Sequence, residues 1–161
     1  MATTPGLSWT IKDSLVSYVE ALDDGMVEAL APASRSAAGF WFPLAGEAAG
    51  SEVGSMSVEL LGTVRLTGHW GALDVELRDP RVELDGRRGT LLIRDRASRD
   101  PQKMVPFAEL AVGRHECADD GSSHVEATAS LTGHGRLLLG GQYRVGEPLS
   151  PLRMSLPPRR G

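Results

Sequence analysis

The chain has 161 residues, of which 41% are apolar, so it can bury the core of one domain without help. Its formal net charge is −4, and no excess of basic residues favours nucleic acid as the main partner. The single cysteine, Cys117, excludes an internal disulfide, and no apolar run approaches the roughly 18–20 residues that cross a bilayer.

The first ten residues carry none of the features of an export signal. They lack the positively charged start and the apolar run of about 7–15 residues that a signal peptide needs. We therefore expect a cytoplasmic protein from the sequence as written. No linker or internal repeat divides the chain, so a single domain is expected over residues 1–161.

The first predicted element is an amphipathic helix over roughly residues 9–22, with Ser8 as its N-cap. Ser14 and Tyr18 are four residues apart and therefore lie next to each other on the helix surface. The apolar positions near one face are Trp9, Leu15, Val19 and Leu22.

The segment after this helix is less regular. Residues 25–38 are rich in alanine and fit either a short strand or a loop. Phe40 and Phe42 flank a tryptophan in a predicted strand that Pro43 ends. Residues 45–55 have the composition of a flexible loop.

The clearest pattern in the chain is the hairpin predicted for residues 63–78. Apolar and polar residues alternate on both sides of a break, as expected for two half-buried strands. The break places His69 and Trp70 at a corner flanked by glycines, which can adopt backbone conformations closed to other residues.

The remaining segments predict further short strands and turns. The tail from Pro148 contains four prolines, so we expect it to close a sheet edge and not to lie centrally within a sheet. The other expected elements are a tight turn at 85–89, strands at 90–93, 105–112 and 123–131, a charged loop at 94–103 and a short apolar run at 137–139. This order predicts a mainly β fold: an antiparallel β-sandwich or open barrel with one N-terminal α-helix.

Five segments follow one another in a recognisable order. They are LSWTIKDSLVSYV (7–19), GFWFPLAG (39–46), TVRLTGHWGALDVELRDPRVEL (63–84), VPFAEL (105–110) and LTGHGRLLLGGQYRVGEPLSPL (131–152). Together they resemble the HtaA domain, a haem-binding module of actinobacterial haem-uptake proteins. The resemblance spans nearly the whole chain and implies a single HtaA-like domain that takes haem b.

Tyr18 has two interpretations. From the residues alone, it is a helix residue with its ring on the core and its hydroxyl at the rim. The resemblance implies instead that the phenolate oxygen of Tyr18 is the ligand of the haem iron. An anionic oxygen ligand favours Fe(III) over Fe(II), which suits a carrier of oxidised haem.

His69 and Trp70 are also open to two interpretations. From the residues alone, His69 is an exposed turn histidine. The resemblance implies that it is the hydrogen-bond partner of the axial tyrosine, and such partners fix a ligand's orientation and basicity. Trp70 could pack on the macrocycle or cover the core.

Further positions follow from the resemblance. It implies that Tyr143 lines the haem pocket and that Ser14 donates a hydrogen bond to a propionate, while Phe42 lines either the pocket or the core. Gln142 and His134 depart from the family pattern, which usually has an aromatic and an acidic or other polar residue there. His134 could be a second axial ligand, an acid–base group or a surface residue, and the residues favour the surface.

Three functions are compatible with these features. The first is a haem-binding protein, monomeric or homodimeric, that transports, transfers or stores ferric haem in exchange with a donor or acceptor protein. The second is a haem-dependent oxidoreductase built on the same tyrosinate-ligated haem. The third is an interaction module that has lost haem, which the joint presence of Tyr18, His69 and Tyr143 disfavours. Family members are usually exported or bound at the cell surface, unlike the cytoplasmic protein expected above.

Overall fold

The computed structural model describes residues 4–49 and 55–158. The helices are α1 (Asp13–Ala21) and α2 (Gly133–Leu138), and η1 (His69–Gly71) is a short 3₁₀ turn. The strands are β1 (Gly6–Trp9), β2 (Met26–Leu30), β3 (Ser34–Ser36), β4 (Gly39–Ala49), β5 (Ser55–Leu60), β6 (Thr63–Gly68), β7 (Leu73–Arg78), β8 (Arg81–Asp85), β9 (Arg88–Arg94), β10 (Met104–Cys117), β11 (Ser123–Leu131) and β12 (Pro148–Leu156). No helix in the described ranges is long and apolar enough to cross a bilayer.

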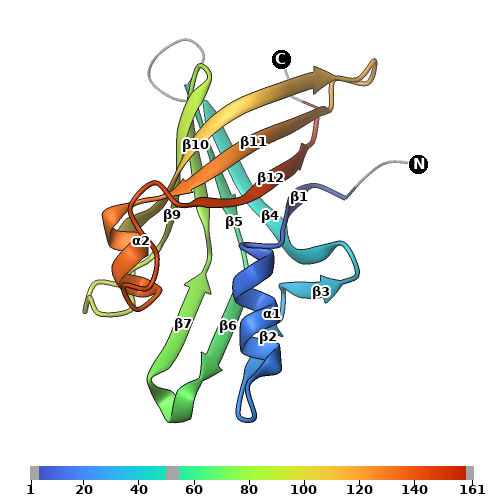
Figure 1. The fold of residues 1–161 in the computed structure, drawn as a ribbon. Helices are drawn as coiled ribbons and strands as arrows, with labels where there is room; N and C mark the ends of the chain where they lie inside the picture. The colour runs from blue at the N-terminus through green and yellow to red at the C-terminus, as the bar shows by residue number, and fades with distance from the viewer. Residues whose placement is uncertain (1–3, 50–54, 159–161) are drawn as a thin grey trace.

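The larger sheet is rolled into a barrel (Figure 1). Its strand order is β1-β12-β11-β10-β9-β8-β5-β4-β3, with every pair antiparallel. β1 also pairs with β4, which closes the sheet and leaves β3 as an outer addition. The predicted mainly antiparallel β fold is therefore confirmed, and of the two forms expected the structure has the barrel.

Aromatic side chains fill the barrel interior. Trp9 and Phe107 are at most 2% exposed, and their rings meet edge to face with centroids 6.1 Å apart. The buried indole also keeps its polar partner, because Trp9 Nε1 donates to the carbonyl oxygen of Ser150 at 2.6 Å. This hydrogen bond connects the first and last strands of the barrel within its core.

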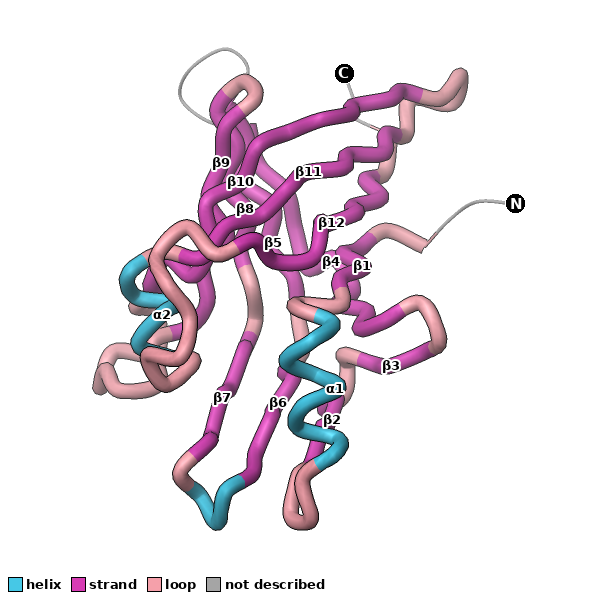
Figure 2. The backbone as a smooth tube through the Cα atoms, in the orientation of Figure 1, coloured by secondary structure: helices cyan, strands magenta, loops and turns pink. Residues whose placement is uncertain are grey.

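A smaller sheet, in the order β2-β6-β7, projects from the barrel together with α1 (Figures 1 and 2). We call α1 and this sheet the projection. One face of the sheet is apolar, because side chains such as Leu66 and Leu77 alternate with polar neighbours and are buried. Helix α1 contributes the buried residues Leu15, Val16 and Val19. The predicted hairpin at residues 63–78 is confirmed as β6, η1 and β7.

The predicted start of the first helix is wrong. Residues 6–9 form strand β1, and α1 begins only at Asp13, with Lys12 in the N-cap position in place of Ser8. Leu7 and Trp9 are buried on either side of a half-exposed serine. Burial therefore repeats every two residues, as in a strand, and not every 3.6 residues, as in a helix. Trp9 therefore belongs to the barrel core and not to the helix face.

The predicted end of the next strand is also wrong, because β4 continues through Pro43 to Ala49. Pro43 pairs with Gly6 of β1 on one side, at the point where the other neighbour of β4 changes from β3 to β5. A residue without an N–H group is tolerated at such an interruption of the ladder. The loop expected at residues 45–55 is therefore strand at both ends, and its middle, residues 50–54, lies outside the described residues.

The proline-containing tail does not lie at an edge. β12 lies between β1 and β11, and Pro151 falls at the irregularity where Ala127 pairs with Leu152 and Ala129 with Leu149. A bulge of this kind accommodates proline within a sheet because one residue is left out of the ladder. The apolar run at residues 137–139 lies at the end of a second helix, α2, which the sequence did not predict.

Candidate functional site

Two side chains from separate parts of the chain meet at the far end of the projection. Tyr18 lies on the outer surface of α1 and is 49% exposed, because the buried face of the helix is formed by other residues. His69 begins η1, at the corner between β6 and β7. The Tyr18 hydroxyl and His69 Nε2 form a hydrogen bond, and the ring centroids are 5.6 Å apart. The structure thus joins the two residues that the resemblance singled out first.

The corner that carries His69 has an unusual backbone. His69, Trp70 and Gly71 have φ angles of 51°, 57° and 94°, all in the left-handed region. For a residue with a side chain, this region costs roughly 1–2 kcal/mol, so His69 and Trp70 need support from their surroundings. The support comes from Asp24, in the turn after α1, whose carboxylate accepts hydrogen bonds from both backbone N–H groups.

Tyr143 lies beside the start of α1. Lys12 Nζ is 5.3 Å from the centroid of the Tyr143 ring and forms an ion pair of 3.3 Å with Glu147. Burial raises the pKa of Tyr143 above its usual value, and the nearby Glu147 carboxylate raises it further, whereas the hydrogen-bonding Ser14 side chain lowers it. The Tyr18 phenol is also close enough to raise this pKa. Ser14, Tyr18 and Tyr143 therefore share one neighbourhood.

The other positions from the sequence are placed differently. Trp70, next to His69, is 87% exposed, so its ring does not cover the core. Phe42 is fully buried within the barrel, because Phe40 and Phe42 alternate inward along β4, and the structure does not bring it to the Tyr18–His69 pair. Gln142 and His134 are exposed, His134 on α2.

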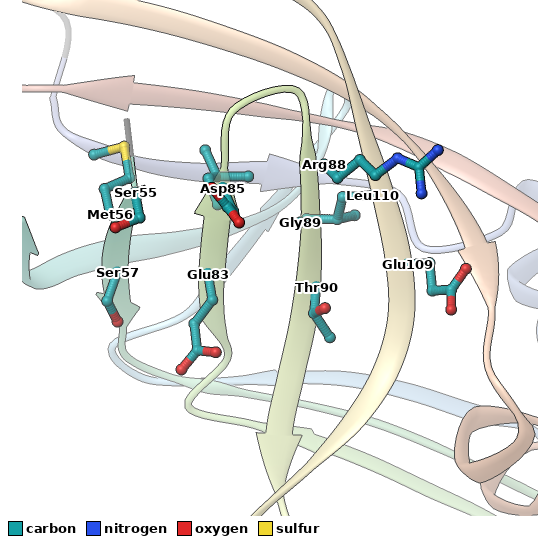
Figure 3. Close-up of a pocket in the computed structure, with 11 residues that line it drawn as sticks. Ser55, Met56, Ser57, Glu83, Asp85, Arg88, Gly89, Thr90, Glu109 and Leu110 are labelled. Carbon is teal, nitrogen blue, oxygen red and sulfur yellow. The ribbon is translucent and has the colours of Figure 1, made fainter. Parts of the chain in front are cut away.

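A hollow of about 650 Å³ lies elsewhere, over β5, β8, β9 and β10 (Figure 3). Ser57, Glu83 and Thr90 are register partners on neighbouring strands and project from the same side of the sheet in Figure 3. Side chains from adjacent strands line any curved sheet surface in this way, and none of the residues around this hollow belongs to the Tyr18–His69 neighbourhood. We therefore identify the candidate site by the polar side chains that meet at Tyr18 and His69, and not by the volume of this hollow.

Asp24 is the residue of the candidate site that sequence reasoning missed. It follows α1 in a turn-forming Asp-Asp-Gly sequence, where a carboxylate needs no further explanation. Its partners are backbone N–H groups of residues 69 and 70, which leave no signature in side-chain patterns. No local signal in the sequence could have connected these two segments.

Solved structures similar to this chain share its fold over almost their full length. The C-terminal domain of HtaA from Corynebacterium glutamicum has a TM-score of 0.80 and 19% identity, with 96% of each chain covered. The N-terminal domain of the same protein has a TM-score of 0.79 and 21% identity, with 99% of each chain covered. The heme-binding protein HtaB of that organism has a TM-score of 0.73 and 23% identity, covering 96% of this chain and 92% of its own.

Among curated proteins, no sequence matches this chain. The family model HtaA, described as Htaa, matches residues 5–155, which include both helices, every strand of the projection and all of the candidate site. The chain belongs to the HtaA family.

Proposed function

We propose that this protein binds ferric haem b as a cargo, with the phenolate oxygen of Tyr18 as the iron ligand. The observation that carries the proposal is the hydrogen bond between the Tyr18 hydroxyl and His69 Nε2 on a half-exposed surface. Membership of the HtaA family supports it, as does the similarity to a structure described as a heme-binding protein.

The side chains present fit this ligand. A phenolate oxygen is an established axial ligand of haem iron, and the exposed Tyr18 offers that oxygen without removal of a covering side chain. His69 would accept or donate the hydrogen bond that orients the phenol and tunes its basicity. Haem supplies the Fe(III) that this oxygen would bind.

Neighbouring residues would hold the rest of the ligand. Ser14 and Tyr143, which already interact with each other, offer hydroxyl groups for a haem propionate. Trp70 presents an exposed indole beside His69, an apolar face that a macrocycle could cover. An exposed ligand of this kind suits exchange of haem with a donor or acceptor protein more than chemistry in an enclosed pocket.

A hemin titration followed by visible absorption tests the proposal. The wild-type protein should bind one hemin and show the charge-transfer band of a phenolate complex, and Tyr18→Phe should lose both the band and most of the affinity. The matched control is Tyr143→Phe, which removes the hydroxyl of the chain's other tyrosine and should retain the band. An unchanged spectrum and affinity in Tyr18→Phe would show that another residue binds the iron, and a wild-type protein that ignores hemin would refute the function itself.

A further inference from the structure

The turn after α1 contacts the corner that carries His69. Asp24 lies in this turn, and its Oδ1 accepts the backbone N–H of His69 at 3.1 Å. Its Oδ2 accepts the backbone N–H of Trp70 at 2.6 Å. A single carboxylate thus accepts hydrogen bonds from two successive N–H groups that are distant from it in the sequence. These contacts connect the turn after α1 to the corner between β6 and β7.

These two N–H groups belong to the left-handed residues described above. Successive N–H groups in a turn of this kind point into a shared concavity that favours an anion. The carboxylate of Asp24 occupies that concavity from within the same chain. Within the described ranges, Asp24 is the only negatively charged hydrogen-bond partner of His69 and Trp70, so the conformation of these two residues depends on its carboxylate.

Two glycines allow the turn and the corner to approach this closely. A Cβ atom on Gly68 would press against the side chain of Leu22, and one on Gly25 would collide with the carbonyl group of Val19. The turn is therefore packed directly between the last turn of α1 and the corner.

We propose that Asp24 is a positioning residue for His69, and that it fixes the imidazole against the Tyr18 oxygen. The proposal rests on the function proposed above, because the Tyr18–His69 pair is the site concerned. Tyr18 binds the imidazole from α1, and Asp24 binds the backbone of the same histidine from the turn that follows α1. His69 is held at two points by one continuous segment, which sets the direction of its ring relative to the phenol.

Amide hydrogen exchange of the haem-free protein tests the positioning directly. Asp24→Ala should speed exchange at His69 and Trp70 about tenfold, because both N–H groups lose a charged acceptor. Asp23→Ala removes the neighbouring exposed carboxylate and should leave both rates unchanged, and Asp24→Asn, which keeps one carbonyl oxygen, should restore part of the protection. Equal exchange in Asp24→Ala and wild type would overturn the proposal whether or not the protein binds haem.

Transfer of hemin to apomyoglobin tests the consequence for the site. Asp24→Ala should retain the band that depends on Tyr18 but release hemin about fivefold to tenfold faster, as expected for a misdirected hydrogen-bond partner. In a His69→Ala background, the same substitution should add nothing, because the residue that it positions is gone. Equal acceleration in both backgrounds would assign Asp24 to the general stability of the corner and overturn the positioning role. Wild-type protein that binds no hemin would contradict the proposed function and leave the exchange result to decide the role of Asp24.

Discussion

The barrel and the projection use aromatic side chains in opposite ways. In the barrel strands, Trp9 and Phe107 point inward and are at most 2% exposed. In the projection, Tyr18 is 49% exposed and Trp70 is 87% exposed. None of the exposed large hydrophobic residues of the described chain lies in a barrel strand. The barrel buries its apolar side chains, whereas the projection exposes some of its own at its far end.

The two regions also differ in their backbones. The barrel is a closed set of antiparallel ladders, in which nearly every strand has a partner on each side. The end of the projection has three successive residues in the left-handed region, supported by the carboxylate of Asp24. Departures from regular geometry of this kind occur where a site needs a particular arrangement. Folding stability and ligand binding should therefore be separable by mutation.

The largest difference in stability between the two regions should come from a mutation in the barrel core. We expect Phe107→Ala to lower the free energy of unfolding by about 3–5 kcal/mol, because it leaves a cavity beside Trp9. Trp70→Ala, which removes a larger but exposed side chain, should change the free energy of unfolding by about 0.5 kcal/mol or less. Urea unfolding of the two variants measures both values. A loss at Trp70 as large as the loss at Phe107 would remove the distinction between the regions.

His69→Ala should show the reverse behaviour. The substitution affects an exposed residue, so the unfolding free energy should change by less than about 1 kcal/mol. Haem should remain bound with an altered spectrum, and its transfer to an acceptor should become about tenfold faster, since the phenol loses its partner. Stopped-flow transfer to apomyoglobin gives the rate. An unaltered spectrum together with an unaltered rate would reduce His69 to a residue of the turn.

A smaller effect is expected at Tyr143, where the two regions meet. Its pKa is raised in the folded protein, chiefly by burial, so the folded state resists ionisation of this phenol. The unfolded chain loses the proton first, near pH ~10, and stability should therefore fall as the pH rises through and above that value. Urea unfolding at several alkaline pH values should show a shallower fall in Tyr143→Phe than in wild type. A steeper fall in the variant would mean that the shift has the opposite sign.

The smallest effect should come from an ion pair between the regions. Arg96, in the loop after β9, lies 3.1 Å from Asp74 on β7, and its hydrogen bond lowers the pKa of that carboxyl. Because the pair is partly exposed, Arg96→Ala should lower stability by only about 0.5 kcal/mol at neutral pH. A lowered carboxyl pKa stabilises the folded state at pH values above the unfolded-state pKa of ~3.9. The difference in stability between Arg96→Ala and wild type should therefore shrink as the pH falls below that value, and vanish once the pH is also below the folded-state pKa of Asp74. A difference that persists in acid would point to packing of the arginine stem instead.

Local features of the sequence predicted the hairpins well. The alternation around residues 63–78 and the turn at residues 85–89 depend on neighbours in the chain, and both are present in the structure. The predicted start of the first helix was wrong because Trp9 and its strand contact distant segments, including Ser150 and β12 near the other end of the chain. Propensity and spacing within one segment carry no information about such partners.

Only part of the candidate site could be predicted from the sequence. Tyr18 and His69 are 51 residues apart, and their hydrogen bond was expected from family resemblance and not from any spacing. The two interpretations of Phe42, core or pocket, could be separated only by the direction of its side chain along β4. Asp24 was missed because it acts on backbone groups, which every residue has.

The position of β12 has a consequence for the order of folding. Gly6 pairs with Ser155, so the barrel closes only when strands from opposite ends of the chain have met. Contacts of such long sequence separation form slowly, since the intervening chain must first lose entropy. Until closure, β1 and β12 are open to pairing with other molecules. Pro148 and Pro151 lack the N–H groups that such pairing requires, so the first half of β12 is a poor template for another strand.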